Sequence, residues 1–184
     1  MRGFTAALLA VLALGISAIV SAQQDAGAPK VSVTLVSEPW ILAFDVKDFA
    51  VKTNELQPDG QAYLLAENQK TSITLSVYLE RIPGVATSAD CAEIQKKRVE
   101  EKADYKREKI ETRESSGMAI VEYTIPEFSG APIQQRNLFA CLPKDDVYVD
   151  IHLSKVLFKP KDEELFNSIL NAAHFILKPP TGTK

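Results

Sequence analysis

The residue types best suited to chemistry lie close together near the C-terminal end of the sequence. The segment NLFACLPKDDVYVDIHLSKV, residues 137–156, contains Cys141, which is one of two cysteines, and His152, which is one of two histidines. A thiol nucleophile needs a base within hydrogen-bond reach and a third group that orients the base. A cysteine active site in this segment would require Cys141 and His152 to lie within that reach.

The spacing of the two residues argues against direct proton transfer. The segment is typical of two strands joined by a turn at PKDD, in which residues whose numbers sum to about 289 face each other. This register pairs Cys141 with Tyr148 and His152 with Asn137. Cys141 and His152 would then lie four positions apart along the strands, a separation of about 13 Å. The segment predicts a structural hairpin, with no catalytic residue and no enzymatic activity.

Metal and cofactor binding have no clear sequence signal. His152 and His174 are the only histidines, and neither belongs to a histidine pair at ligand spacing. Asp150 and His152 lie two positions apart, which many strands show by chance. The eight glycines are scattered and form no phosphate-binding loop. We expect no metal site and no cofactor.

The first 22 residues, MRGFTAALLAVLALGISAIVSA, are typical of a secretory signal peptide. Arg2 precedes an apolar run over 4–20, and small residues precede Gln23. An uncleaved anchor is the alternative, because 17 apolar residues reach the lower limit for spanning a bilayer. No cysteine follows the run to accept a lipid. We expect an exported protein, periplasmic or extracellular, with no stable membrane insertion after signal cleavage.

The expected export guides the interpretation of the net charge and of the two cysteines. Without residues 1–22 the chain has 20 basic and 24 acidic residues, a net charge of −4, which offers no electrostatic reason to bind nucleic acid. Two cysteines in an exported chain favour a disulfide between Cys91 and Cys141, and two free thiols are the alternative.

The remaining sequence predicts a single domain over residues 38–178. Residues 23–37 are small and polar, and we expect a flexible tether there; residues 179–184 are expected to form a disordered tail. TSITLSVYL and VYVDIHLSKV alternate apolar and polar residues, as strands with one buried face do. ILAFDV, FAVKT, QAYLLAE, MAIVEYTI and IQQRNLFACL are further strand candidates.

Two segments have helical patterns instead. KDEELFNSILNAAHF, residues 161–175, has apolar residues at helical spacing and acidic residues in its first turn. TSADCAEIQKKRVEEKADYKREKIE, residues 87–111, contains no glycine or proline, and Thr87 or Ser88 can cap its start. Its apolar stripe is thin, so we expect a surface helix that a disulfide from Cys91 would hold. The predicted fold class is α+β, with an antiparallel sheet packed with helices.

This order of elements resembles the PsbP-like superfamily. The resemblance rests on several strands, a polar helix, a meander ending in DVYVDIHLSKV, the amphipathic segment DEELFNSILNAAHF and a short final strand. The superfamily includes the photosystem II extrinsic protein, a Ran-binding nuclear import factor, and bacterial exported proteins of the DcrB and LpqN type. The resemblance implies an α/β/α sandwich and a non-catalytic binding or assembly role, and it transfers no functional residue.

One set of residues is a candidate binding surface. Polar and aromatic side chains are expected on the sheet face opposite the apolar one, and an ordinary solvated face is the alternative interpretation. The set comprises Thr74, Ser76, Tyr78, Glu122, Arg136, Tyr148, Asp150 and His152.

Three classes of function remain. The favoured one is a non-catalytic exported domain that binds a protein partner or an envelope component. The second is a small-ligand carrier with a pocket between the sheet and the C-terminal helix. The third is an enzyme whose site shows no recognisable pattern.

Overall fold

The computed structural model describes residues 31–102 and 106–179. The predicted signal peptide, residues 23–30 of the predicted tether, and residues 180–184 of the predicted tail lie outside these ranges. The tether prediction is wrong for residues 31–37. Val31, Val33 and Leu35 are buried in the core, and the first two belong to a strand. The domain therefore includes residues 31–37.

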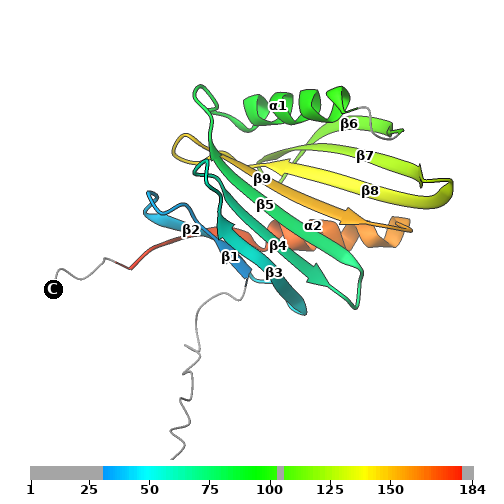
Figure 1. Cartoon of the computed structure of the whole chain (residues 1–184), viewed down its shortest axis with the longest axis horizontal. Coiled ribbons are helices and arrows are strands. Elements are labelled where there is room, and N and C mark those ends of the chain that lie inside the picture. The colour runs from blue at the N-terminus through cyan, green and yellow to red at the C-terminus, as the bar shows by residue number, and fades with distance from the viewer. Residues whose placement is uncertain (1–30, 103–105, 180–184) are drawn as a thin grey trace, which may run out of the picture.

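The centre of the fold is a seven-stranded antiparallel sheet with the order β3-β4-β5-β9-β8-β7-β6 (Figure 1). Its two edges are β3, which has a bulge between Val51 and Thr53, and the charged strand β6. The strands, in sheet order, are β3 (Phe49–Leu56), β4 (Ala62–Asn68), β5 (Ile73–Arg81), β9 (Val147–Lys155), β8 (Ala131–Cys141), β7 (Met118–Phe128) and β6 (Glu108–Ser115).

Different elements cover the two faces of this sheet (Figure 1). One face packs against the helix α2 (Glu163–Asn171) and a small antiparallel sheet of β1 (Val31–Val33), β2 (Trp40–Phe44) and β10 (Ala173–Leu177). The other face packs against the single helix α1 (Ser88–Glu101). The result is three layers, with the large sheet in the middle.

The main core lies between the large sheet and the layer that contains α2. Trp40, Phe44 and Phe166 are among its largest fully buried side chains. Trp40 meets Phe175 of β10 edge to face, with ring centroids 5.0 Å apart. Aromatic side chains of this size bury the most apolar area per residue, so they supply much of the free energy of folding.

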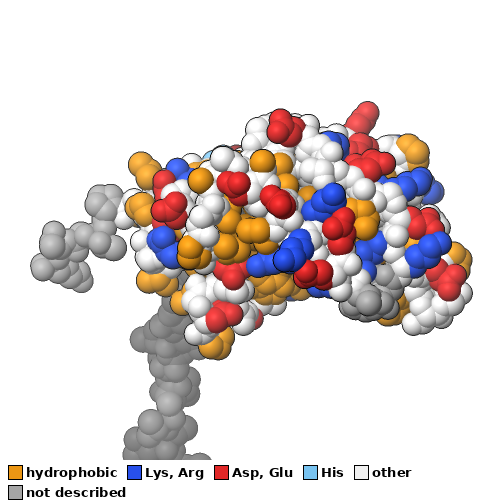
Figure 2. All heavy atoms as spheres, turned by 90° about the horizontal axis from the view of Figure 1, so that it is seen from above, with side chains coloured by type: hydrophobic (Ala, Val, Ile, Leu, Met, Phe, Trp, Pro, Cys, Tyr) orange, Lys and Arg blue, Asp and Glu red, His pale blue; other side chains and the backbone are white. Residues whose placement is uncertain are grey.

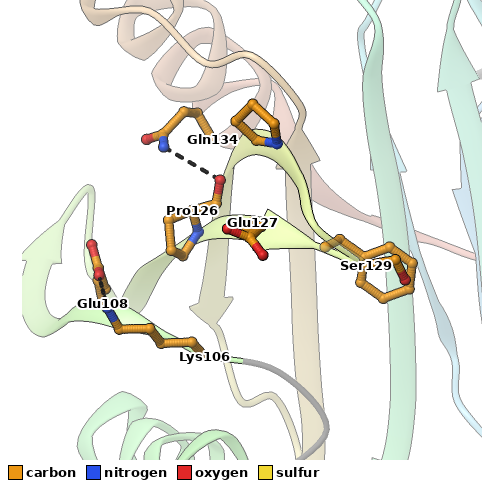
Figure 3. A pocket seen from close by; sticks show the side chains of 8 residues that line it. Lys106, Glu108, Pro126, Glu127, Ser129 and Gln134 are labelled. Carbon is orange, nitrogen blue, oxygen red and sulfur yellow. Dashed lines mark hydrogen bonds and ion pairs between the residues drawn. The ribbon is translucent and has the colours of Figure 1, made fainter.

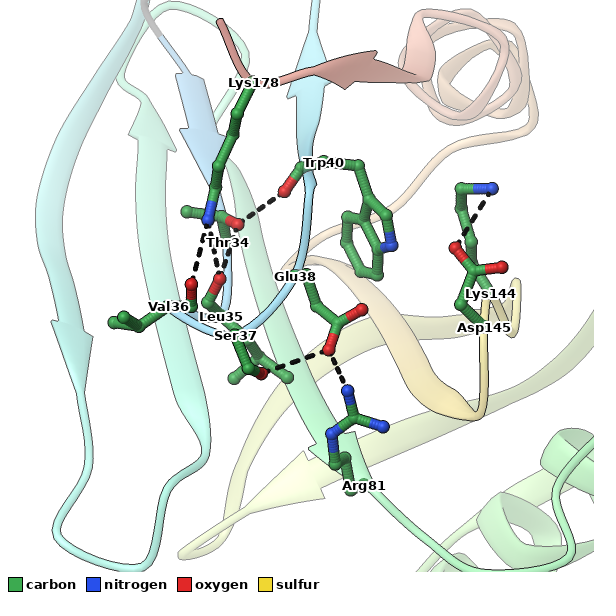
Figure 4. A network of polar contacts seen from close by, with 10 residues as sticks. All are labelled: Thr34, Leu35, Val36, Ser37, Glu38, Trp40, Arg81, Lys144, Asp145 and Lys178. Atoms are coloured by element: carbon green, nitrogen blue, oxygen red, sulfur yellow. Dashed lines mark hydrogen bonds and ion pairs between the residues drawn. The ribbon is translucent and has the colours of Figure 1, made fainter. Parts of the chain in front are cut away.

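A polar network ties the β1–β2 turn to the large sheet (Figure 4). Glu38, which is 4% exposed, forms an ion pair with Arg81 at the end of β5. The ammonium group of Lys178 donates to the carbonyl oxygen of Leu35 at 2.9 Å. The first contact ties the β1–β2 connection to the large sheet, and the second ties it to the residue after β10.

The helix α1 begins as predicted but ends earlier. Thr87 caps it through a capping box with Asp90. The helix stops at Glu101, and the strand β6 starts at Glu108, so the prediction of one helix over 87–111 is wrong. The cause is that β6 is a charged edge strand with few apolar residues, and its pattern does not distinguish it from a solvated helix.

The second predicted helix is also shorter than expected. It begins after a 3₁₀ turn (Pro160–Asp162) and ends at Asn171, because Ala173–Leu177 pair with β2 as β10. His174 therefore lies in a strand rather than at a helix end. Its Nδ1 atom is 3.1 Å from the carbonyl oxygen of Ala172.

Cys91 and Cys141 form the predicted disulfide, which joins the first turn of α1 to the last residue of β8; their Cα atoms are 5.6 Å apart. The bridge closes a loop of 50 residues.

Replacing both cysteines, Cys91→Ala with Cys141→Ala, should lower the free energy of unfolding by about 4 kcal/mol, since the unfolded chain regains its loop entropy. Urea unfolding of the variant and the oxidised wild type measures the difference. A loss below about 1 kcal/mol would show that packing alone holds α1.

Candidate functional site

Six of the eight predicted surface residues share the face of the sheet that α1 partly covers. β5 and β9 are neighbours, and their register places Tyr78 opposite Asp150 and Ser76 opposite His152. We call this set the α1-side face; it comprises Thr74, Ser76, Tyr78, Tyr148, Asp150 and His152.

The other two predicted residues lie on the opposite face. Glu122 and Arg136 form an ion pair at 2.7 Å on the α2 side of the sheet, and Glu122 also pairs with Arg113 of β6 at 3.4 Å. The prediction grouped them wrongly because β7 is buried on both faces. Its apolar residues do not alternate, so the pattern does not reveal which way Glu122 points.

The register of the β8–β9 hairpin differs by two from the predicted one. Cys141 faces Asp150, and His152 faces Phe139. Cys141 and His152 are therefore two positions apart along the strands rather than four. Both cysteines are in the disulfide, so Cys141 has no thiol that could act as a nucleophile.

The α1-side face is largely buried, which a solvated sheet face would not be. Tyr148 is fully buried, Asp150 is 4% exposed and Ser76 is 6% exposed. Tyr78, at 40%, is the most accessible of the large side chains. The solvated alternative is therefore wrong for the centre of this face, and α1 is the reason.

Tyr148 fixes the helix above it. Its hydroxyl group donates a hydrogen bond of 2.9 Å to Oε1 of Gln95 on α1, and the guanidinium group of Arg98 lies 5.2 Å from the centre of its ring. Burial raises the pKa of Tyr148 far above its ordinary value. The hydroxyl group therefore stays protonated and remains a donor.

His152 is held neutral between three partners. Its ring stacks on Phe139 with centroids 4.1 Å apart. Its Nδ1 atom is 3.3 Å from the Ser76 hydroxyl group, and its Nε2 atom is 3.2 Å from Oδ1 of Asn137. Burial, followed by the positive charge of Lys102, lowers the pKa of His152 to about 4. The imidazole is consequently a poor proton acceptor at neutral pH.

Asp150 is the least satisfied group of the α1-side face. Its Oδ1 atom is buried without a hydrogen-bond partner. Burial raises the pKa of its carboxyl group to about 7, against the opposing effect of Arg98 and Lys102. Asp150 lines a cavity of about 320 Å³ between α1 and the sheet. A cavity of this size next to an unpartnered carboxyl group can hold a small ligand.

The sequence did contain a signal for two residues that the prediction missed. Cys141 must point towards α1 once the disulfide is assumed, and side chains two positions apart share a face of a strand. Phe139 and Asn137 therefore had to lie beside the predicted surface residues. Gln95 had no comparable signal, because the thin apolar stripe does not fix the rotation of α1.

Two other cavities offer less convergent chemistry. One of about 640 Å³ lies beside the β7–β8 turn (Figure 3), where Lys106 pairs with Glu108 and the Gln134 amide donates to the carbonyl oxygen of Pro126. Another of about 250 Å³ lies between α2 and the β3–β4 end of the sheet. Its Asn68 side chain already accepts hydrogen bonds from two backbone N–H groups.

Within 31–102 and 106–179, no three His, Cys, Asp or Glu side chains are grouped as metal ligands would be. Over the same residues, no helix has the length and apolar character that crossing a bilayer requires.

Comparison with known proteins identifies the fold. No family model and no curated protein matches the chain. The solution structure of cyanobacterial PsbP (CyanoP) from Synechocystis sp. PCC 6803 is similar to it, with a TM-score of 0.54 and 15% sequence identity, over 86% of this chain and 99% of that chain. Membership of the DcrB and LpqN type stays a prediction. The predicted α+β class, with an antiparallel sheet packed with helices, is confirmed, and the chain has a PsbP-like fold.

The raised pKa of Asp150 makes a specific contribution to stability. At pH values between the ordinary pKa of an aspartate and about 7, the Asp150 carboxyl group is protonated in the folded state and ionised in the unfolded state. Its contribution to the free energy of unfolding is therefore present at low pH and is lost as pH rises towards 7. Asp150→Asn does not titrate. Its stability relative to wild type should therefore improve by about 2 to 3 kcal/mol from pH 5 to pH 8.

Urea unfolding at both pH values measures this change. Asp145→Asn is the matched control, since Asp145 is an exposed turn residue whose side chain is 58% accessible. It removes one carboxylate at the surface and so controls for the loss of a negative charge as such. A pH-independent effect of Asp150→Asn would show that the carboxyl group keeps an ordinary pKa.

Proposed function

We propose that this chain is a non-catalytic exported domain that binds a protein partner, as an accessory or assembly factor of the cell envelope. The observation that carries the proposal is a partly exposed aromatic pair on the α1 side of the sheet. Tyr63 of β4 and Tyr78 of β5 face each other, with ring centroids 4.6 Å apart. Tyr78 is 40% exposed, so α1 leaves part of this pair open to solvent.

The surroundings of this pair suit a protein interface. Glu80 accepts hydrogen bonds from Gln61 at 3.1 Å and from Arg98 at 3.3 Å, so polar groups with satisfied partners border the two rings. Tyrosine and arginine are enriched at the energetic centres of interfaces. Tyrosine buries a large area and loses little conformational freedom on binding. Seen from the side on which α1 lies, exposed hydrophobic side chains are interspersed with acidic and basic ones (Figure 2).

The fold and the disulfide support the proposed setting. The PsbP-like fold agrees with the non-catalytic accessory role that the sequence resemblance implies. A disulfide persists in an oxidising compartment, which supports export to the periplasm or the extracellular space.

A small-ligand carrier is the second candidate, with the pocket between sheet and C-terminal helix. The cavity beside α2 favours it, because Leu165 and Ile169 supply apolar lining and the buried Thr71 hydroxyl group lacks a partner. Native mass spectrometry of the exported protein would reveal a retained ligand, and a bare chain mass would count against this candidate.

The partner can be captured at the aromatic pair. A photo-crosslinking amino acid in place of Tyr78 should give a discrete adduct in the exporting cell, whereas the same amino acid at the exposed Lys161, on the α2 side, should not. Adding Tyr63→Ala should weaken the Tyr78 adduct about tenfold or more, because truncation of an interface anchor costs more than 1 kcal/mol. Tyr63→Phe keeps the ring and should retain the adduct. Equal adducts at both positions, or none at Tyr78, would count against the proposal.

A further inference from the structure

A buried carboxyl group lies at the floor of the cavity beneath the C-terminal half of α1. The helix contributes Gln95, Arg98 and Val99 to the lining, and its C-cap residue Lys102 lines it too. The sheet contributes Asp150 of β9 with side chains of β5, β7 and β8, and Gln61 before β4 completes the lining. Asp150 is 96% removed from solvent, since its exposed fraction is 4%. This cavity adjoins the surface of the Tyr63–Tyr78 pair and shares with it Gln61, Tyr78, Glu80 and Arg98.

Most polar groups of the lining are already partnered within the protein. Glu80 receives hydrogen bonds from Gln61 and Arg98, and Gln95 accepts one from the hydroxyl group of Tyr148. Asp150 differs, because its Oδ1 atom is buried and accepts no hydrogen bond. Burying such an acceptor without a donor is costly, so a ligand that supplies a donor would recover that free energy.

The remaining lining selects the chemistry of the donor. The rings of Tyr78, Phe139 and Tyr123 border the cavity. Aromatic faces attract cations, and a carboxylate forms its strongest hydrogen bonds with a charged donor. Arg98 is already paired with Glu80, so its charge is offset within the lining. Lys102 is the second cation of the lining, and its positive charge favours the ionised form of Asp150 that an ammonium group would bind.

We propose that this cavity binds a small organic amine, whose ammonium group donates to the carboxylate of Asp150 while its apolar body contacts the rings of Tyr78 and Phe139. The volume of about 320 Å³ suits a ligand of one ring and a short chain. This inference goes beyond the proposed function and does not depend on a protein partner.

Calorimetric titration of the purified, disulfide-bonded chain at pH 8 tests the proposal with three compounds of matched shape. Phenethylamine should bind with a dissociation constant below about 1 mM, the range expected for so small a ligand. The neutral 2-phenylethanol and the anionic phenylacetate should bind at least tenfold more weakly, because neither presents a charged donor to Asp150.

Asp150→Asn should weaken phenethylamine binding at least tenfold, whereas Asp145→Asn should leave it unchanged. Urea unfolding of Asp150→Asn at pH 8, the measurement described above, distinguishes loss of binding from loss of the fold. Phe139→Leu, which removes an aromatic wall and keeps an apolar one, should weaken binding several-fold.

Three results would overturn the proposal: no binding of phenethylamine at 10 mM (on the order of ten times the expected constant), equal binding of the alcohol or the acid, or unchanged binding by Asp150→Asn. The purified chain is tested alone. Failure of the crosslinking experiment therefore leaves this proposal intact, and failure here leaves the partner proposal intact.

Discussion

The disulfide between Cys91 and Cys141 is the constraint on which the arrangement above the sheet depends. The helix α1 has few buried apolar residues, namely Cys91, Ala92 and Val99, so its packing alone offers a weak hold. The bridge fixes its first turn to β8, and the bond from Tyr148 to Gln95 fixes its middle. A helix held at points rather than by a continuous apolar stripe need not fill the space beneath it. The cavity at Asp150 is the result.

The two faces of the large sheet bury different kinds of side chain. The α2 side is an apolar core around Trp40 and Phe166. The α1 side buries ionisable groups and adjusts their protonation instead. The pKa of Asp150 is raised to about 7 and that of His152 is lowered to about 4, so between these values both side chains are uncharged in the folded state. Desolvation of a neutral group costs far less than desolvation of an ion, and the face tolerates its low exposure for that reason.

The sequence predicts the structure well where the hydrophobic pattern of a segment fits one kind of element only. β5 and β9 alternate cleanly, and their six predicted surface residues share a face as expected. The sequence places Glu122 on the wrong face because β7 is apolar on both sides. It predicts a helix at β6 because the charged residues of this strand fit the helical period as well as the strand period. The hairpin register was off by two because the turn was centred on Lys144 and Asp145, whereas the closing bridge joins Lys144 to Val147. The sequence pattern does not predict cavities, because a cavity forms where two packed elements leave space between their side chains.

The edges of the large sheet bear on how the protein behaves at high concentration. An unpaired strand is a template on which another chain can add, and long antiparallel sheets risk growing in this way. β3 has a bulge next to Lys52, which interrupts the regular spacing of its free N–H and C=O groups. β6 carries charged side chains along its length, among them Glu111 and Glu114. Charged side chains on an edge strand oppose the addition of another strand. Both ends of the sheet therefore resist fibre-like stacking of identical copies, so the domain can expose a long edge in a crowded compartment without polymerising.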